Sequence, residues 1–111
     1  MYAVKEDVEK LVQKELESAN QRFPMFRSDH EGAAVIFEEI QEAEYELECA
    51  KDRFQELWRS VKNDLSAEWI AEVGVVITNR AINLACEAIQ VAAMAQKFID
   101  SQKERERNEG N

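Results

Sequence analysis

The sequence predicts an all-α fold, a bundle of three or four helices. Only three Gly and one Pro occur among 111 residues, so residues that interrupt helices are few. Apolar residues recur at steps of three and four, which is the period of a helix with one buried face. The length suits one domain with a modest core. We therefore expect a single all-α domain over residues 1–100 and a flexible, charged C-terminal tail over residues 101–111.

The first expected helix precedes Pro24. Its apolar positions lie three or four residues apart and are Val4, Val8, Leu11, Val12, Leu16 and Ala19. Such spacing is typical of one amphipathic helix. Because a proline disfavours the helical conformation of the residue before it, Pro24 should end this helix.

The second expected helix is long. Ser28 followed three residues later by Glu31 fits a capping box, which predicts a helix start here. The apolar residues then follow a heptad seam made by Ile36, Ile40, Ala43, Leu47, Ala50, Phe54, Leu57 and Val61. A helix this long spans roughly 50 Å at about 1.5 Å per residue, more than a small core covers. We expect a long central helix that packs against another long helix or a second copy of the chain.

The third segment follows KNDLS at residues 62–66 and is apolar on nearly all sides. Gly74 and the β-branched residues after it weaken the helical pattern, which favours a break or kink there. From Ala81 onward an Ala-rich spacing returns, and small residues allow neighbouring helices to approach closely. This part should lie in the centre of the bundle.

The charge of the chain limits its partners. A net charge of −9 argues against nucleic acid and against an anionic membrane surface, because both need a basic protein face. No apolar stretch reaches the length of a membrane span, and the first residues lack the apolar core of a signal peptide. Cys49 and Cys86 are isolated and form no CxxC motif. These features favour a cytoplasmic protein.

The segment EEIQEAEYE, residues 38–46, places five carboxylates in nine positions. Glu39, Glu42 and Glu46 each precede a residue of the apolar seam, so they share one flank of the helix. No Lys or Arg occurs between residues 28 and 50. Like charges at this spacing repel by a few tenths of a kcal/mol per pair, and a bound cation would relieve the repulsion. The alternative is a solvated acidic helix face.

A second group of polar residues lies on the apolar third segment, at steps of four, four and three: Asn79, Asn83, Glu87 and Gln90. A Glu among so many apolar residues is normally paired or bound to a metal. If the two helices pair antiparallel, Glu39 and Glu42 can face Glu87. Three carboxylates suit Mg²⁺ or Mn²⁺ rather than Zn²⁺. The alternatives are a hydrogen-bonded seam that fixes helix register, or a solvated face.

The stretches HEGAAVIFEEIQEAEYEL and LACEAIQVAAMAQKF resemble the MazG-like superfamily of all-α nucleotide pyrophosphohydrolases, especially its small phage- and prophage-encoded members. The resemblance covers roughly residues 28–61 and 80–99. It implies a helical bundle that works as a homodimer or tetramer. It also implies Mg²⁺ bound by an ExxE motif and a later ExxD motif, and cleavage of a nucleoside triphosphate to a monophosphate and pyrophosphate.

Carried over to this chain, the resemblance assigns Glu39 and Glu42 to the ExxE motif and Glu87 to the first position of ExxD, all as metal ligands. Glu38 is the acidic neighbour and becomes the candidate general base or further ligand. Gln90 stands where the family has Asp. An amide brings no charge and cannot act as a base, so weakened activity is expected.

Three further residues complete the expected nucleotide site. Asn83 and Gln90 would orient water, phosphate or the ligating carboxylates. Lys97 lies two turns beyond Gln90 and would contact phosphate oxygens, although a surface lysine is the simpler interpretation. The alternative function is a catalytically silent helical oligomer that serves as a scaffold or protein-binding module. In that case Glu87 would be neutralised by a hydrogen bond or by an arginine such as Arg80.

Overall fold

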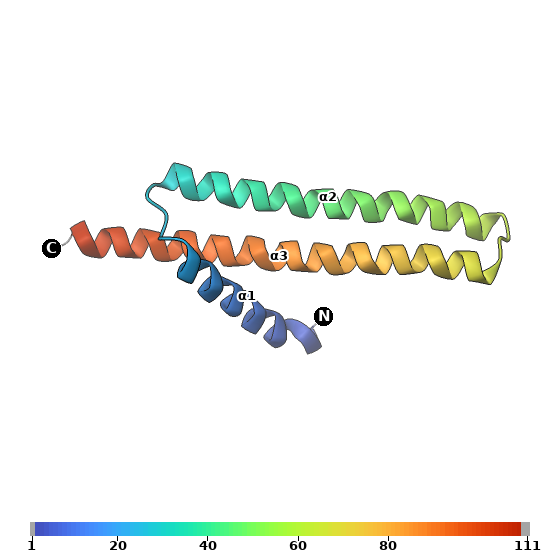
Figure 1. Cartoon of the computed structure of the whole chain (residues 1–111), viewed down its shortest axis with the longest axis horizontal. Helices are drawn as coiled ribbons and strands as arrows, with labels where there is room; N and C mark the ends of the chain where they lie inside the picture. The colour runs from blue at the N-terminus through green and yellow to red at the C-terminus, as the bar shows by residue number, and fades with distance from the viewer. Residues whose placement is uncertain (1, 110–111) are drawn as a thin grey trace. The chain divides into compact units, whose positions relative to one another are not determined.

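The computed structural model describes residues 2–109, which form three α-helices and no strand (Figure 1). The helices are α1 (Tyr2–Arg22), α2 (Asp29–Lys62) and α3 (Ala67–Glu109). The predicted all-α class is confirmed. Over the described residues, no helix carries an apolar stretch long enough to cross a membrane.

The chain divides into two compact units, whereas the sequence predicts one domain over residues 1–100. The terminal unit contains Met1–Ile40 and Ala88–Asn111, and the hairpin unit contains Gln41–Glu87. A chain of this size has too little apolar material for one core to cover helices of 34 and 43 residues along their whole length. Each unit is therefore described by itself.

The predicted helix boundaries are confirmed at the N-terminal side. α1 ends at Arg22, shortly before Pro24. α2 begins at Asp29, and the Ser28 hydroxyl accepts a hydrogen bond of 3.1 Å from the backbone N–H of Glu31. This bond satisfies one of the amide groups that every helix start leaves without a partner.

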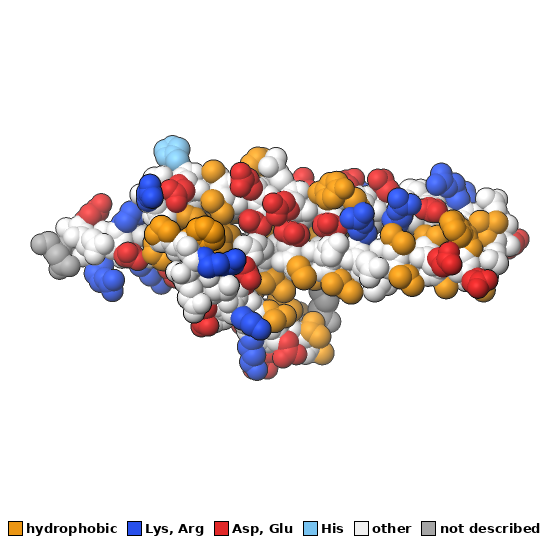
Figure 2. Space-filling model, viewed as in Figure 1, with side chains coloured by type: hydrophobic (Ala, Val, Ile, Leu, Met, Phe, Trp, Pro, Cys, Tyr) orange, Lys and Arg blue, Asp and Glu red, His pale blue; other side chains and the backbone are white. Residues whose placement is uncertain are grey.

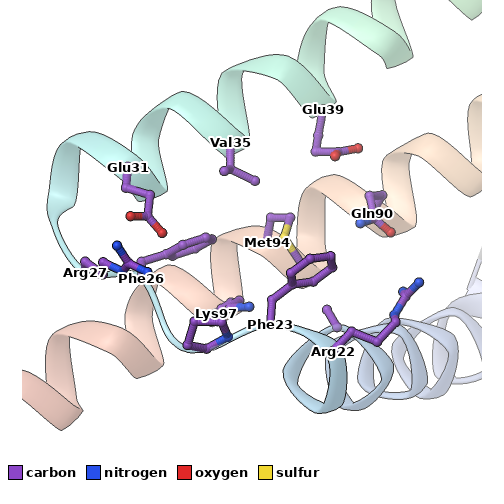
Figure 3. A pocket seen from close by; sticks show the side chains of 12 residues that line it. Arg22, Phe23, Phe26, Arg27, Glu31, Val35, Glu39, Gln90, Met94 and Lys97 are labelled. Atoms are coloured by element: carbon purple, nitrogen blue, oxygen red, sulfur yellow. The ribbon is translucent and has the colours of Figure 1, made fainter.

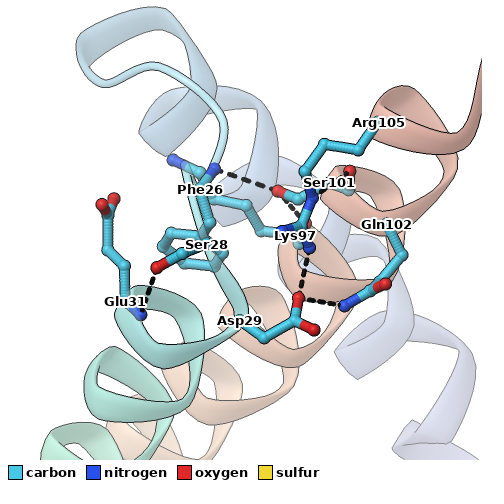
Figure 4. A network of polar contacts seen from close by, with 8 residues as sticks. All are labelled: Phe26, Ser28, Asp29, Glu31, Lys97, Ser101, Gln102 and Arg105. Atoms are coloured by element: carbon cyan, nitrogen blue, oxygen red, sulfur yellow. Dashed lines mark hydrogen bonds and ion pairs between the residues drawn. The ribbon is translucent and has the colours of Figure 1, made fainter. Parts of the chain in front are cut away.

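The core of the terminal unit joins all three helices and the loop between α1 and α2. Its buried residues are Leu16, Ala19, Phe26, Ala93 and Met94. Val35 and Phe98 pack against this cluster from α2 and α3. The loop is fixed by Ser101, whose hydroxyl accepts a hydrogen bond of 3.0 Å from the Phe26 N–H and donates one of 2.8 Å to the Lys97 carbonyl (Figure 4).

The structure differs from the flexible tail expected over residues 101–111. Residues 101–109 are the last turns of α3, and Ser101 is only 1% exposed. Gln102 and Arg105 donate hydrogen bonds to the Asp29 carboxylate at the start of α2 (Figure 4). Arg105, one of the charged residues that suggested a solvated tail, thus has an acidic partner more than 70 residues earlier in the chain. Residues 110 and 111 lie outside the described range.

The hairpin unit pairs the later part of α2 with the first part of α3, in antiparallel directions (Figure 1). The turn contains Asp64 at a φ of 50°, a left-handed conformation that Asp tolerates better than most residues. The Ser66 hydroxyl then accepts a 3.1 Å hydrogen bond from the Trp69 N–H and begins α3. Gly74 does not break α3, contrary to expectation. The cost of a few weak helix formers is small beside the packing of a long helix.

Half of the heptad seam on α2 is uncovered in the hairpin unit. Ala43, Ala50 and Leu57 are half-buried. The alternate seam residues are between 45% and 52% exposed, and these are Leu47, Phe54 and Val61. Apolar side chains are correspondingly visible over the surface in Figure 2. A two-helix hairpin has only one interface, so one of its two apolar series is left open to solvent or to another chain.

Candidate functional site

Three carboxylates predicted as metal ligands come together. One carboxylate oxygen of each of Glu39, Glu42 and Glu87 lies within 4.8 Å of the other two. Glu39 and Glu42 are one turn apart on α2, and Glu87 is on α3. Glu39 and Glu87 are half-buried, whereas Glu42 is exposed. Helical spacing, together with an assumed antiparallel pairing of the two helices, predicts this proximity, while the binding of a metal here stays a prediction.

Glu87 is the electrostatically unfavourable member of this group. Burial raises the pKa of its carboxyl above the usual 4.5, and a hydrogen bond with Glu42 and the negative charges of Glu42 and Glu46 raise it further. The site therefore holds more negative charge than its surroundings stabilise, which is the condition that a bound cation or a proton would relieve.

Arg80 does not neutralise Glu87. Its guanidinium donates to the Glu46 carboxylate at 3.2 Å, and this hydrogen bond is the main reason that the pKa of Arg80 is raised. The scaffold alternative predicted either an arginine or a hydrogen bond at Glu87. In the structure, Arg80 pairs with Glu46, and the hydrogen bond of Glu87 is with Glu42, which is itself a carboxylate.

The donor set fits a hard divalent cation. All three candidate ligands are carboxylates, which suit Mg²⁺ or Mn²⁺. Ligands on opposite sides of Mg²⁺ are about 4.2 Å apart, given bonds of about 2.1 Å. The carboxylate oxygens lie within 4.8 Å of one another, which is compatible with ligands of one such ion.

The other predicted site residues do not all lie in one place. Gln90 and Lys97 line a pocket of about 540 Å³ in the terminal unit, and Glu39 lines the same pocket (Figure 3). Glu38 and Asn83 are exposed, and neither belongs to the carboxylate group or to the lining of this pocket. Their expected roles stay predictions.

The structure adds pocket residues that sequence reasoning missed. Arg22 and Phe23 at the end of α1, and Arg27 in the following loop, line the same pocket. From the sequence, only Pro24 of the segment RFPMFR carries a prediction, as the end of the first helix. Two arginines and two phenylalanines around a proline were the available signal, because loops held by a rigid scaffold often carry binding residues.

Lys97 is a further surprise, because it is 2% exposed rather than a surface lysine. Its ammonium lies over the ring of Phe26, 5.2 Å from the ring centroid. Burial lowers the pKa of Lys97, and the nearby Glu31 charge opposes this shift.

The pKa of Glu87 predicts a pH dependence of stability in EDTA. Because the folded pKa is raised above 4.5, the folded state binds more protons than the unfolded chain between 4.5 and the raised pKa. The free energy of unfolding should therefore fall as the pH rises through this window. Glu87→Gln removes this contribution, so the variant should gain stability relative to wild type with rising pH, as urea unfolding measures. Glu44→Gln, on the exposed side of α2, should follow wild type; a Glu87→Gln difference independent of pH would contradict the prediction.

Comparisons of the chain with protein-family models, with curated proteins and with solved structures give no significant match. The resemblance to the MazG-like superfamily therefore stays a prediction that depends on the residues themselves.

Proposed function

We propose that the protein is a Mg²⁺-dependent hydrolase of nucleoside triphosphates, built on a MazG-like helical bundle of phage or prophage type, which releases pyrophosphate and a monophosphate. The observation that supports this most is the group of Glu39, Glu42 and Glu87, with oxygens within 4.8 Å of one another. Glu39 also lines the pocket that contains Lys97. A candidate cation ligand and a candidate phosphate contact thus share one cavity.

The roles of the residues follow from their chemistry. Glu39, Glu42 and Glu87 would hold Mg²⁺, which neutralises negative charge on the substrate phosphates when bound. The Gln90 amide, in the pocket beside Glu39, can donate a hydrogen bond to a phosphate or to water. Glu38 is exposed at the neighbouring position and is the candidate general base.

Gln90 sets the expected level of activity. With Gln in place of Asp, the site has three anionic ligands instead of four. Affinity for the cation depends on ligand charge, so the protein should need more Mg²⁺ than a four-carboxylate site. Gln90→Asp should then lower the Mg²⁺ concentration required for activity.

The test is the release of pyrophosphate from a panel of nucleoside triphosphates in Mg²⁺ or Mn²⁺. We expect equal amounts of pyrophosphate and monophosphate, and no release in EDTA. Absence of product with every nucleotide and both metals would contradict the proposal. Release of inorganic phosphate without pyrophosphate would also contradict it.

We further propose that the chain forms a homodimer or tetramer. The open seam of Leu47, Phe54 and Val61 on α2 supports this, because a second hairpin would cover it and complete a four-helix arrangement. The seam equally suits the scaffold alternative. Sedimentation should show a dimer or larger species, and Phe54→Glu should shift it towards monomer. We also infer a cytoplasmic location, since Cys49 and Cys86 are free thiols.

A further inference from the structure

Lys97 is a buried cation that no acidic side chain pairs with. It is 2% exposed, and its contact is the face of the Phe26 ring at 5.2 Å. The described residues give its ammonium no hydrogen bond or salt bridge, and the nitrogen is not sealed from solvent. The nitrogen reaches the pocket, as Figure 3 shows.

The position of Lys97 is unfavourable for folding. Burial of the side chain disfavours its charged form and lowers the pKa of this residue, so the charge of Lys97 is less well stabilised in the folded protein than in water. The ring of Phe26 and the charge of Glu31 offset only part of this cost. A methionine would fill similar space without the cost of burying a charge, so packing does not explain the lysine. An anion in the pocket would supply the missing partner.

The pocket has two more cations. Arg22 lies at the end of α1, with its guanidinium 5.9 Å from the centroid of the Phe23 ring, and Arg27 lies in the loop. Both side chains are exposed, whereas Lys97 is inside (Figure 3). The chain as a whole carries a net charge of −9. This pocket therefore differs from the acidic chain around it. Three cations line it, against two acidic residues, Glu31 and Glu39.

We propose that this pocket is a phosphate subsite in which the Lys97 ammonium donates hydrogen bonds to phosphate oxygens, while Arg22 and Arg27 add positive charge around it. The link to a nucleotide rests on the function proposed above, because Glu39 belongs to both the pocket and the carboxylate group. Phosphate binding itself needs only the three cations. It should therefore occur without a divalent metal.

The experiment titrates the full chain with inorganic pyrophosphate in EDTA, by calorimetry at low salt. Wild type should bind, and adenosine, which has no phosphate, should not. Lys97→Met should weaken pyrophosphate binding at least about 10-fold, as the loss of a charge-assisted hydrogen bond predicts. The same variant should raise Tm by about 4 °C, since it removes an unpaired buried charge. Lys103→Met, an exposed lysine on the same helix, is the charge-matched control and should bind like wild type.

Two results would overturn the subsite: no pyrophosphate binding by wild type, or equal binding by wild type and Lys97→Met. A Lys97→Met variant with lower Tm would also overturn it, because the lysine would then be structural. The result is separable from the proposed function. Pyrophosphate binding in EDTA with no nucleotide hydrolysis in Mg²⁺ supports the subsite and contradicts the hydrolase. Mg²⁺-dependent hydrolysis, together with pyrophosphate binding that does not depend on Lys97, supports the hydrolase and contradicts the subsite.

Discussion

Glu87→Gln is expected to abolish the rise in Tm that millimolar Mn²⁺ gives to wild type, and to slow pyrophosphate release by on the order of 10²-fold. Glu87 is the candidate ligand that α3 contributes to the carboxylate group. Without its charge, Glu39 and Glu42 remain as a pair of carboxylates on one helix, which are too few to bind Mn²⁺ tightly.

The same substitution should have the opposite effect in the absence of metal. The Glu87 carboxyl is destabilised in its charged form by burial and by Glu42, so a neutral amide relieves that repulsion. In EDTA at neutral pH, Glu87→Gln should melt at or above the wild-type temperature. This separates loss of a ligand from loss of the fold.

Glu44→Gln is the matched control, because Glu44 is exposed and lies about 140° around α2 from Glu39. It should keep both the Mn²⁺ response and the rate. An Mn²⁺ response that survives Glu87→Gln would mean that the ion binds elsewhere on this acidic chain, and the assignment of Glu87 would be wrong.

Gly32→Ala is expected to destabilise the protein by about 1–3 kcal/mol. A Cβ at position 32 would lie 2.5 Å from Cδ2 of Phe98 and 3.0 Å from Cδ2 of Phe26. Phe26 belongs to the buried core and Phe98 packs against it, so neither ring can move away freely. The clash outweighs the gain of up to about 1 kcal/mol that alanine brings to a helix interior.

Gly74→Ala provides the comparison with the opposite sign. Nothing lies within 4 Å of a Cβ built at this position, and α3 is helical there. The free energy of unfolding should rise by about 0.5–1 kcal/mol, measured by urea denaturation of both variants. If the two substitutions have equal effects, α2 does not pack against Phe98 as described.

The features that sequence predicts are those set by local chemistry. Pro24 and the Ser28 cap act on their immediate neighbours, so the helix boundaries there follow from a few residues. Helical spacing places Glu39 and Glu42 on one flank of α2. One further assumption, an antiparallel partner, is enough to bring in Glu87.

The features that sequence does not predict depend on contacts between distant residues. Ser101 is buried because its hydroxyl holds the Phe26 amide, 75 residues earlier, and nothing near Ser101 signals this. The sequence around Lys97 is typical of a surface lysine, whereas in the structure the side chain is buried near the loop and α1. The pocket forms only where the end of α1, the loop and α3 meet. The sequence alone therefore does not show that Arg22 and Arg27 line a pocket with Lys97.

The most direct test of the carboxylate site is the anomalous scattering of Mn²⁺ in crystals of the full chain soaked with the ion. We expect one peak within about 2.5 Å of carboxylate oxygens from Glu39, Glu42 and Glu87. This peak should disappear in Glu87→Gln crystals. A Mn²⁺ peak on other acidic residues, with Glu42 and Glu87 still hydrogen-bonded to each other, would contradict it.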